Sequence, residues 1–348
     1  MPAEAPSPRL MNLPSPRPSP VGRERVPEGR VRVGSGPLGV SVEPRELPTR
    51  TPADLLRQVR LVELRARRLV ADLLAGPYRS VFRGRGLELD EIRAYQPGDD
   101  VRSIDWHTTA RTGDVQVKQH VEERCLTLML AVDISASGDF ASGPRSKREL
   151  AAELAAILAL SAALSNDRVG LLLFSDRIER YLPPRPGRRQ ALAIVAAVLG
   201  HPPRGRGTSL RVALEALGSA LRRRATLFLI SDFLDRDFDR PLRIAARRHE
   251  VVALCLHDRA EARLPELGWL ACEDAETGEL LELDTSHAAV RHAFDLEHHA
   301  RTAALAERFR RAGVESVSCA THDAGPHALL RFFARRQRRA GGPGPAPR

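Results

Sequence analysis

Short apolar runs alternate with amphipathic or alanine-rich segments from residue 124 to residue 338. The apolar runs predict a strand that begins near Leu126 and ends at Asp133, followed by strands at 168–174, 177–182, 225–231, 251–256 and 314–319. The segments between them predict helices at about 146–165, 187–199, 210–223, 237–248, 286–312 and 325–338. Apolar strands that alternate with helices are typical of a parallel sheet covered on both faces. We therefore predict an α/β fold with a doubly wound, mostly parallel sheet.

Two segments interrupt this alternation. Pro183–Gly187 is rich in proline and predicts a turn. The segment 261–284 predicts a hairpin that turns at Thr277 and Gly278. Both are insertions between the predicted elements of the main domain, so they leave the order of strands and helices intact.

The chain before the main domain has a different character. Apolar residues return at helical spacing from Thr51 to Leu74, with arginines between them, and predict one amphipathic helix. Short extended pieces with turns follow up to residue 123 and predict a small β-rich arm, with Trp106 as a core anchor. Residues 1–50 are rich in Pro and Arg without periodicity, which predicts a disordered tail, and 339–348 predict another. The predicted organisation is a tail at 1–50, a helix and arm at 51–123, a main domain at 124–338 and a tail at 339–348.

The 348-residue chain has a formal net charge of +10 and a pI of about 10.5. A strongly basic chain raises nucleic acid or an anionic membrane as partners. All basic residues except Lys118 and Lys147 are arginines, however, a bias that a GC-rich genome explains more simply than a phosphate-binding surface does. We therefore expect a solvated basic surface and keep an arginine-rich nucleic-acid binder as an alternative.

The cysteine content and the lack of long apolar runs bear on the compartment. Cys125, Cys255, Cys272 and Cys319 form no C-x-x-C pair, and at least three lie in apolar, strand-like surroundings. Such cysteines are typical of buried free thiols in a reducing compartment. No apolar run approaches the roughly 18 residues that a membrane span needs, and the N-terminal stretch lacks a hydrophobic signal core. We expect a soluble, cytoplasmic chain without a membrane span.

Oxygen-bearing side chains follow two of the predicted strands. Asp133, Ser135 and Ser137 leave the first strand, Asp232 follows the strand that ends at residue 231, and Thr208 precedes the helix that leads to that strand. Ligands of open parallel sheets bind beyond the carboxyl ends of the strands, where the strand order reverses. If these two strands flank that point, two carboxylates and three hydroxyls face one cleft. Hard oxygen donors of this kind suit Mg²⁺, Mn²⁺ or Ca²⁺ rather than zinc.

The same residues have simpler interpretations. Asp, Ser and Thr are the residue types that cap helices and form turns, and each of the five alone is more easily explained in that way. Their joint arrangement favours a metal site. An alternative is a Mg²⁺-dependent phosphohydrolase with Asp133 as nucleophile, although such enzymes generally carry a second carboxylate two residues later, where this chain has Ser135. We therefore expect a binding protein rather than an enzyme.

The pattern D-x-S-x-S with a later Thr and a later Asp resembles the metal-ion-dependent adhesion site of von Willebrand factor A domains, and all five positions match. The wider sequence, from about residue 50 to residue 338, is similar to the bacterial family called domain of unknown function 58. The blocks that carry this resemblance are Tyr95–Asp99, Ile104–Trp106, Asp167–Gly170, Ser231–Phe233, Arg247–His249 and Arg331–Phe333. Because several blocks occur in the family's order, the resemblance is specific.

The resemblance implies a von Willebrand factor A-like fold in which Asp133, Ser135, Ser137, Thr208 and Asp232 hold a divalent cation, some of them through water. It implies an open coordination position on that ion, which an acidic side chain of a partner protein fills. It further implies that the partner is a MoxR-type AAA+ ATPase in a chaperone-like or metal-insertion system. The expected function is therefore that of a metal-ion-dependent protein-interaction module, without catalytic residues.

Overall fold

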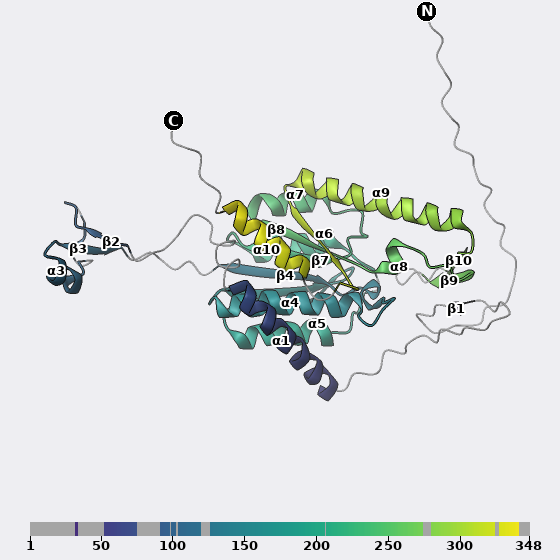
Figure 1. The fold of residues 1–348 in the computed structure, drawn as a ribbon, viewed down its shortest axis with the longest axis horizontal. Coiled ribbons are helices and arrows are strands. Elements are labelled where there is room, and N and C mark those ends of the chain that lie inside the picture. The colour runs from purple at the N-terminus through teal and green to yellow at the C-terminus, as the bar shows by residue number, and fades with distance from the viewer. Residues whose placement is uncertain are drawn as a thin grey trace, which may run out of the picture.

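A six-stranded sheet forms the centre of the protein (Figure 1). The computed structural model describes residues 32–33, 52–74, 91–97, 99–101, 104–119, 126–205, 207–273, 280–323 and 327–340. The strands of the sheet are β4 (Thr127–Asp133), β5 (Arg168–Phe174), β6 (Ile178–Arg185), β7 (Thr226–Ser231), β8 (Glu250–His257) and β11 (Glu315–Ala320). They lie in the order β11-β8-β7-β4-β5-β6, and all neighbours are parallel except β5 and β6.

The strand order reverses at β4, the first strand of this sheet in the chain. β5 and β6 follow on one side of β4, whereas β7, β8 and β11 follow on the other side. This is the doubly wound order 3-2-1-4-5-6, whose switch point lies between the first and fourth strands, here β4 and β7. The predicted α/β fold with a mostly parallel sheet is confirmed, and the switch point lies where the predicted ligands leave their strands.

Helices cover both faces of the sheet. One face packs against α1 (Pro52–Leu74), α4 (Lys147–Leu164), α5 (Arg188–Gly200) and α10 (His327–Ala340). The other packs against α6 (Leu210–Ala220), α7 (Asp239–Arg248) and α9 (Ala288–Ala312). Burial on both faces explains why the central strands are apolar throughout instead of alternating with polar residues.

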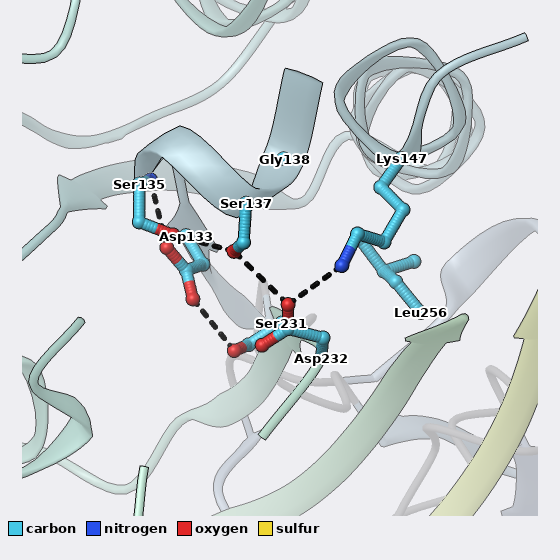
Figure 2. Close-up of a pocket in the computed structure, with 8 residues that line it drawn as sticks. All are labelled: Asp133, Ser135, Ser137, Gly138, Lys147, Ser231, Asp232 and Leu256. Atoms are coloured by element: carbon cyan, nitrogen blue, oxygen red, sulfur yellow. Dashed lines mark hydrogen bonds and ion pairs between the residues drawn. The ribbon is translucent and has the colours of Figure 1, made fainter. Parts of the chain in front are cut away.

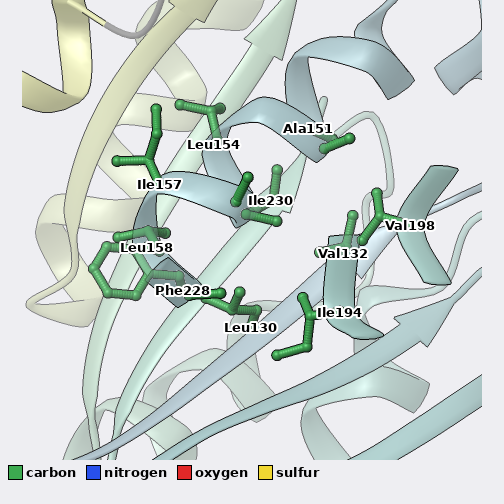
Figure 3. Close-up of a cluster of buried hydrophobic side chains, with 14 of the residues drawn as sticks. Leu130, Val132, Ala151, Leu154, Ile157, Leu158, Ile194, Val198, Phe228 and Ile230 are labelled. Atoms are coloured by element: carbon green, nitrogen blue, oxygen red, sulfur yellow. The ribbon is translucent and has the colours of Figure 1, made fainter. Parts of the chain in front are cut away.

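Strand β4 sends alternate side chains into two separate cores. Leu128, Leu130 and Val132 join the core under α4 and α5, whereas Met129 and Ala131 join the core under α6 and α7, and none of the five is more than 3% exposed. Figure 3 shows Leu130 and Val132 packed with side chains of β7, α4 and α5. The middle of the sheet is therefore dry up to the residue at which β4 ends.

The N-terminal helix is confirmed as α1. The arm consists of β2 (Glu91–Ala94), paired antiparallel with β3 (Gln116–Gln119), and the short helix α3 (Trp106–Thr112). The prediction that Trp106 is a core anchor is wrong, because its side chain is 66% exposed at the first position of α3. One hairpin and a two-turn helix bury too little surface to enclose an indole ring.

The two predicted insertions in the main domain differ in their outcome. The predicted turn at Pro183–Gly187 is wrong at its start, because β6 continues through Pro183 and Pro184 to Arg185. Proline is tolerated there because β6 is the edge strand and does not need every N–H for pairing. The predicted hairpin is confirmed as β9 (Trp269–Glu273) and β10 (Leu280–Asp284), whereas its turn at 277–278 lies outside the described residues.

The predicted tails fall mostly outside the described residues. Within 1–50 only Arg32–Val33 is described, as the short strand β1 paired with β9. The described cysteines, Cys255, Cys272 and Cys319, are free thiols. No described helix has both the length and the apolar character required to cross a bilayer.

Helix α4 begins with a capping box. The Ser146 hydroxyl accepts the Glu149 N–H at 3.2 Å, and the Glu149 carboxylate accepts the Ser146 N–H at 3.2 Å. These bonds satisfy two backbone donors at a helix start that lies against the sheet. The cap therefore fixes the position from which Lys147, the next residue, leaves the helix.

We expect Ser146→Ala to lower the free energy of unfolding by about 1 kcal/mol because the N-terminal donors of α4 lose an acceptor. Urea unfolding followed by circular dichroism measures the change. Ser161→Ala is the matched control in the same helix, since the buried Ser161 hydroxyl has no hydrogen-bond partner among the described residues. The control should be neutral or stabilising. An equal loss in both variants would contradict the role of the cap.

Candidate functional site

A small polar cavity lies at the carboxyl ends of β4 and β7, at the switch point of the sheet (Figure 2). Its volume is about 10 Å³, which is close to the space that one water molecule occupies. The residues that line it are Asp133, Ser135, Ser137, Gly138, Lys147, Ser231, Asp232 and Leu256. Four of the five residues predicted from the sequence thus meet at one place.

Asp133 is the last residue of β4, and both of its carboxylate oxygens accept hydrogen bonds from the protein. The Ser135 N–H donates to Oδ1 at 2.9 Å, and the Ser231 hydroxyl donates to Oδ2 at 2.7 Å. Asp133 is 8% exposed, so water contributes little to the solvation of its charge. The two hydrogen bonds, one from each of the flanking segments, fix the carboxylate between β4 and β7.

A short 3₁₀ helix, Ala136–Asp139, follows Asp133 and turns the chain across the end of the sheet. This turn brings the hydroxyls of Ser135 and Ser137 to 3.1 Å from each other. The Ser137 hydroxyl then donates to Asp232 Oδ2 at 3.0 Å. A continuous row of oxygen atoms therefore joins the end of β4 to the residue that follows β7.

Lys147 enters the site from the first turn of α4. Its ammonium group lies 2.8 Å from Asp232 Oδ2 and 2.6 Å from Glu261 Oε1, and its side chain is 1% exposed. Glu261 belongs to the short helix α8 (Arg259–Ala262), and its side chain is 29% exposed. Figure 2 shows the Lys147 side chain reaching from its helix toward the Asp232 carboxylate.

Thr208, the fifth predicted residue, does not line this cavity. It is half-buried in the segment between α5 and α6, beside Ser209, which caps α6. The Ser209 N–H donates to the Ser175 carbonyl at 2.8 Å, and the Gly205 N–H donates to Glu179 Oε1 at 2.9 Å. These bonds attach the Thr208 segment to the ends of the neighbouring strands β5 and β6.

Sequence reasoning missed three residues of the site. Lys147 did carry a signal, since it is one of only two lysines in a chain that otherwise uses arginine. Ser231 looked like the last residue of an apolar strand, and its contact with Asp133 depends on the pairing of β4 and β7. Glu261 lies in an insertion and carried no signal.

The site holds more negative than positive charge, because the Asp232 and Glu261 carboxylates contact the single ammonium of Lys147 and the Asp133 carboxylate lines the same cavity. Burial raises the pKa of Asp133 to about 6, and the charge of Asp232 adds to this effect. Burial alone would lower the pKa of Lys147, but Asp232 and Glu261 outweigh it and the pKa is raised. The geometry and charge together therefore favour a cation.

The oxygen atoms that hydrogen-bond to one another in the site are also at separations that a small divalent ion would accept. Octahedral Mg²⁺ binds oxygen at about 2.0–2.1 Å, which places adjacent ligands about 3 Å apart. The Ser135–Ser137 and Ser137–Asp232 oxygen separations are 3.1 and 3.0 Å. Within the described ranges, no three His, Cys, Asp or Glu side chains are grouped so that they alone could hold a metal ion. Hydroxyl ligands would therefore have to complete the set, and the residues present fit a hard cation.

The strand order, the helices on both faces and the polar site at the switch point form a doubly wound α/β domain that resembles von Willebrand factor A domains. The family described as "Protein of unknown function DUF58" matches residues 91–304, and the chain belongs to this family. The resemblance noted in the sequence is thus confirmed for the family and for the fold.

Relatives in sequence and in structure were also found. An uncharacterized protein of Mycobacterium bovis is 35% identical over 289 residues, which cover 82% of this chain and 91% of the relative. The crystal structure of the conserved hypothetical protein BatB from Bacteroides thetaiotaomicron is 16% identical with a TM-score of 0.40, covering 61% of this chain and 98% of BatB. The crystal structure of the SpRpn10 VWA domain is 12% identical with a TM-score of 0.34, covering 61% and 95% of the two chains.

We expect Asp133→Asn to stabilise the protein in EDTA at neutral pH. The folded-state pKa of Asp133, about 6, lies above the ordinary value of 3.8, so the folded protein loses stability as pH rises between these values. Asparagine keeps the shape without the charge and should raise the free energy of unfolding at pH 7.5 by up to about 3 kcal/mol. At pH 4 most of the gain should vanish because Asp133 is then protonated in the folded state.

Urea unfolding at pH 7.5 and pH 4 measures both values. Asp237→Asn is the matched control, since Asp237 follows the neighbouring strand β7 but is exposed and does not line the cavity. A gain of the same size at both pH values would contradict the assignment of the effect to the Asp133 charge.

Proposed function

We propose that the protein is a metal-ion-dependent protein-interaction module, and that it acts as a partner or adaptor of a MoxR-type AAA+ ATPase in a chaperone-like system. One observation carries the proposal. Ser135 and Ser137, which follow β4, and Asp232, which follows β7 far along the chain, form a row of oxygen atoms at a spacing that suits cation ligands, and Asp133 lines the same cavity. They do so at the switch point, where this class of fold binds its ligands.

The ligand set defines which ions fit. Carboxylate and hydroxyl oxygens would hold Mg²⁺, or Mn²⁺ or Ca²⁺, with Thr208 as the further ligand that the resemblance implies. When bound, the ion supplies a positive centre with an open coordination position. A carboxylate from a partner protein matches that position in charge and in donor type, so recognition of an acidic side chain is the chemistry we propose.

The position of Asp133 favours recognition over phosphoryl chemistry. A nucleophilic carboxylate needs a path to its substrate, whereas Asp133 is 8% exposed and lines a cavity of only about 10 Å³, which is too small for a phosphate ester. Ser135 also occupies the place at which a second catalytic carboxylate would be expected. These features support a binding role for the site.

The ATPase partner rests on the resemblance to the DUF58 family, to which the chain belongs. A partner that docks through a carboxylate would release the protein when the ion is removed. The proposed interaction is therefore metal-dependent, and this property separates it from binding through the basic surface of the chain.

We expect Asp232→Asn to weaken Mg²⁺ binding by at least about tenfold, because Asp232 Oδ2 is the oxygen that faces the other ligands. Isothermal titration calorimetry of the parent and the variant measures the affinity. Asp237→Asn serves again as the control and should bind like the parent. Equal Mg²⁺ affinity in all three folded proteins would remove the basis for a metal site.

We expect a MoxR-type AAA+ ATPase from the native cell to co-purify with the tagged full-length chain in Mg²⁺ and to be released by EDTA. The reason is that the partner's carboxylate would have no ligand to bind once the ion is removed. Mass spectrometry of the EDTA eluate identifies the partner. Retention of the ATPase in EDTA, or by Asp232→Asn in Mg²⁺, would contradict a metal-dependent contact.

A further inference from the structure

A buried lysine occupies the edge of the proposed metal site. Lys147 is the only positively charged residue among those that line the cavity, and it is one of the largest fully buried side chains of the described protein. A buried ammonium is stable only when it is paired, because the loss of its hydration is costly. The two carboxylates of Asp232 and Glu261 provide that pairing at 2.8 and 2.6 Å.

The ammonium and a divalent ion would bind the same oxygen atom. Asp232 Oδ2 accepts hydrogen bonds from both Lys147 Nζ and the Ser137 hydroxyl, and it is the oxygen that continues the row of candidate ligands. A divalent ion at this oxygen would meet a positive charge less than 3 Å from its own ligand atom. At this range and in a buried site the repulsion is large. Occupation by the ion therefore requires Lys147 to leave Asp232.

Glu261 offers the ammonium a second partner outside the cavity. Its Oε1 atom already contacts Lys147, and its Oε2 atom accepts the Asp258 N–H at 2.9 Å in the capping box of α8. Asp258 itself is fully buried and accepts the hydroxyl hydrogen bond of Thr321 at 2.6 Å. Glu261 is thus held in place by the start of α8, so Lys147 can remain paired with it after losing Asp232.

We propose that Lys147 is a tethered counter-ion that neutralises Asp232 when no divalent ion is bound and, when the ion binds, leaves Asp232 and stays paired with Glu261 alone. This inference rests on the metal-dependent function proposed above. It assigns to Lys147 and Glu261 the setting of metal affinity. The protein keeps a paired, stable site in both states.

The choice of lysine fits this role. The ammonium is a compact charge on a flexible four-carbon stem, whereas guanidinium is a planar fork that prefers one fixed bidentate geometry. A cavity of about 10 Å³ leaves no room for that fork to move between two carboxylates. In a chain whose basic residues are otherwise arginines except for Lys118, lysine stands at this position.

Mg²⁺ titration of Lys147→Met tests the competition directly. Methionine keeps the length of the side chain without the charge, so Mg²⁺ should bind roughly tenfold more tightly or better, since a like charge is removed from the site. Lys118→Met is the matched control because it removes the other lysine, which belongs to strand β3, and its affinity should equal that of the parent. Calorimetry on the full chain gives the affinities.

Glu261→Gln tests the role of Glu261 as the second partner of the Lys147 ammonium. This test does not depend on the folding of Lys147→Met. Without the Glu261 charge, Lys147 has less to gain by leaving Asp232, so Mg²⁺ affinity should fall several-fold. In the Lys147→Met background the same change should have a smaller effect, since no ammonium is left to move. An equal factor in both backgrounds overturns the coupling through Lys147.

The two lysines also permit a direct spectroscopic test. Protein labelled with ¹³C and ¹⁵N at lysine gives two side-chain signals, and Lys147→Met assigns them. Mg²⁺ should shift the Lys147 Cε and Nζ signals and leave those of Lys118 unchanged. An unshifted Lys147 signal at saturating Mg²⁺ overturns the proposal.

The outcomes separate this inference from the proposed function. Equal Mg²⁺ affinity of the parent and Lys147→Met overturns the counter-ion proposal and leaves the metal-dependent function standing. Tight binding by Lys147→Met with weak or undetected binding by the parent supports the proposal. If Mg²⁺ binds to neither protein, both the function and the inference fail.

Discussion

The structure depends on a carboxylate that stands at the end of a dry strand. β4 is buried on both faces, and its last residue, Asp133, stands between Val132 and Ile134, which are both fully buried in the core. A charge in this position cannot rely on water and must be compensated by the protein. The residues around the switch point supply that compensation, and their positions follow from the strand pairing that buries β4.

Two kinds of interaction compensate the negative charges of the site. The Ser135 N–H and the Ser231 hydroxyl solvate Asp133 by hydrogen bonds, whereas Lys147 neutralises the neighbouring Asp232. The raised pKa of Asp133 shows that the hydrogen bonds do not cancel the cost of burial and of the second carboxylate. Additional positive charge would stabilise the buried carboxylates whose charge is not fully compensated. The strand pairing that brings these carboxylates together therefore also favours a cation.

The parts of the site that were predictable are those encoded by single strands. An apolar run that ends in Asp133, and another that ends before Asp232, place both residues at one edge of a parallel sheet whatever the loops do. Lys147 and Glu261 reach the site through the start of α4 and the insertion at α8, and their meeting depends on tertiary packing that periodicity does not reveal. The prediction for Trp106 was wrong for a related reason, because the local sequence pattern does not show how much surface the arm can bury.

The position of Lys147 is unfavourable for a lysine in two respects. It places a positive charge in the first turn of α4, where the helix dipole favours negative charge, and it buries that charge against the sheet. Packing alone would favour an apolar residue there, because Leu150 and Ala151, one turn further along α4, are buried. When a residue is unfavourable for its place in a helix but all of its ion-pair partners are in position, its identity is better explained by function than by stability. The arrangement of Asp232 and Glu261 about the ammonium supplies the reason: Lys147 serves the charge balance of the switch-point site, and the helix start is stabilised by Ser146 and Glu149 instead.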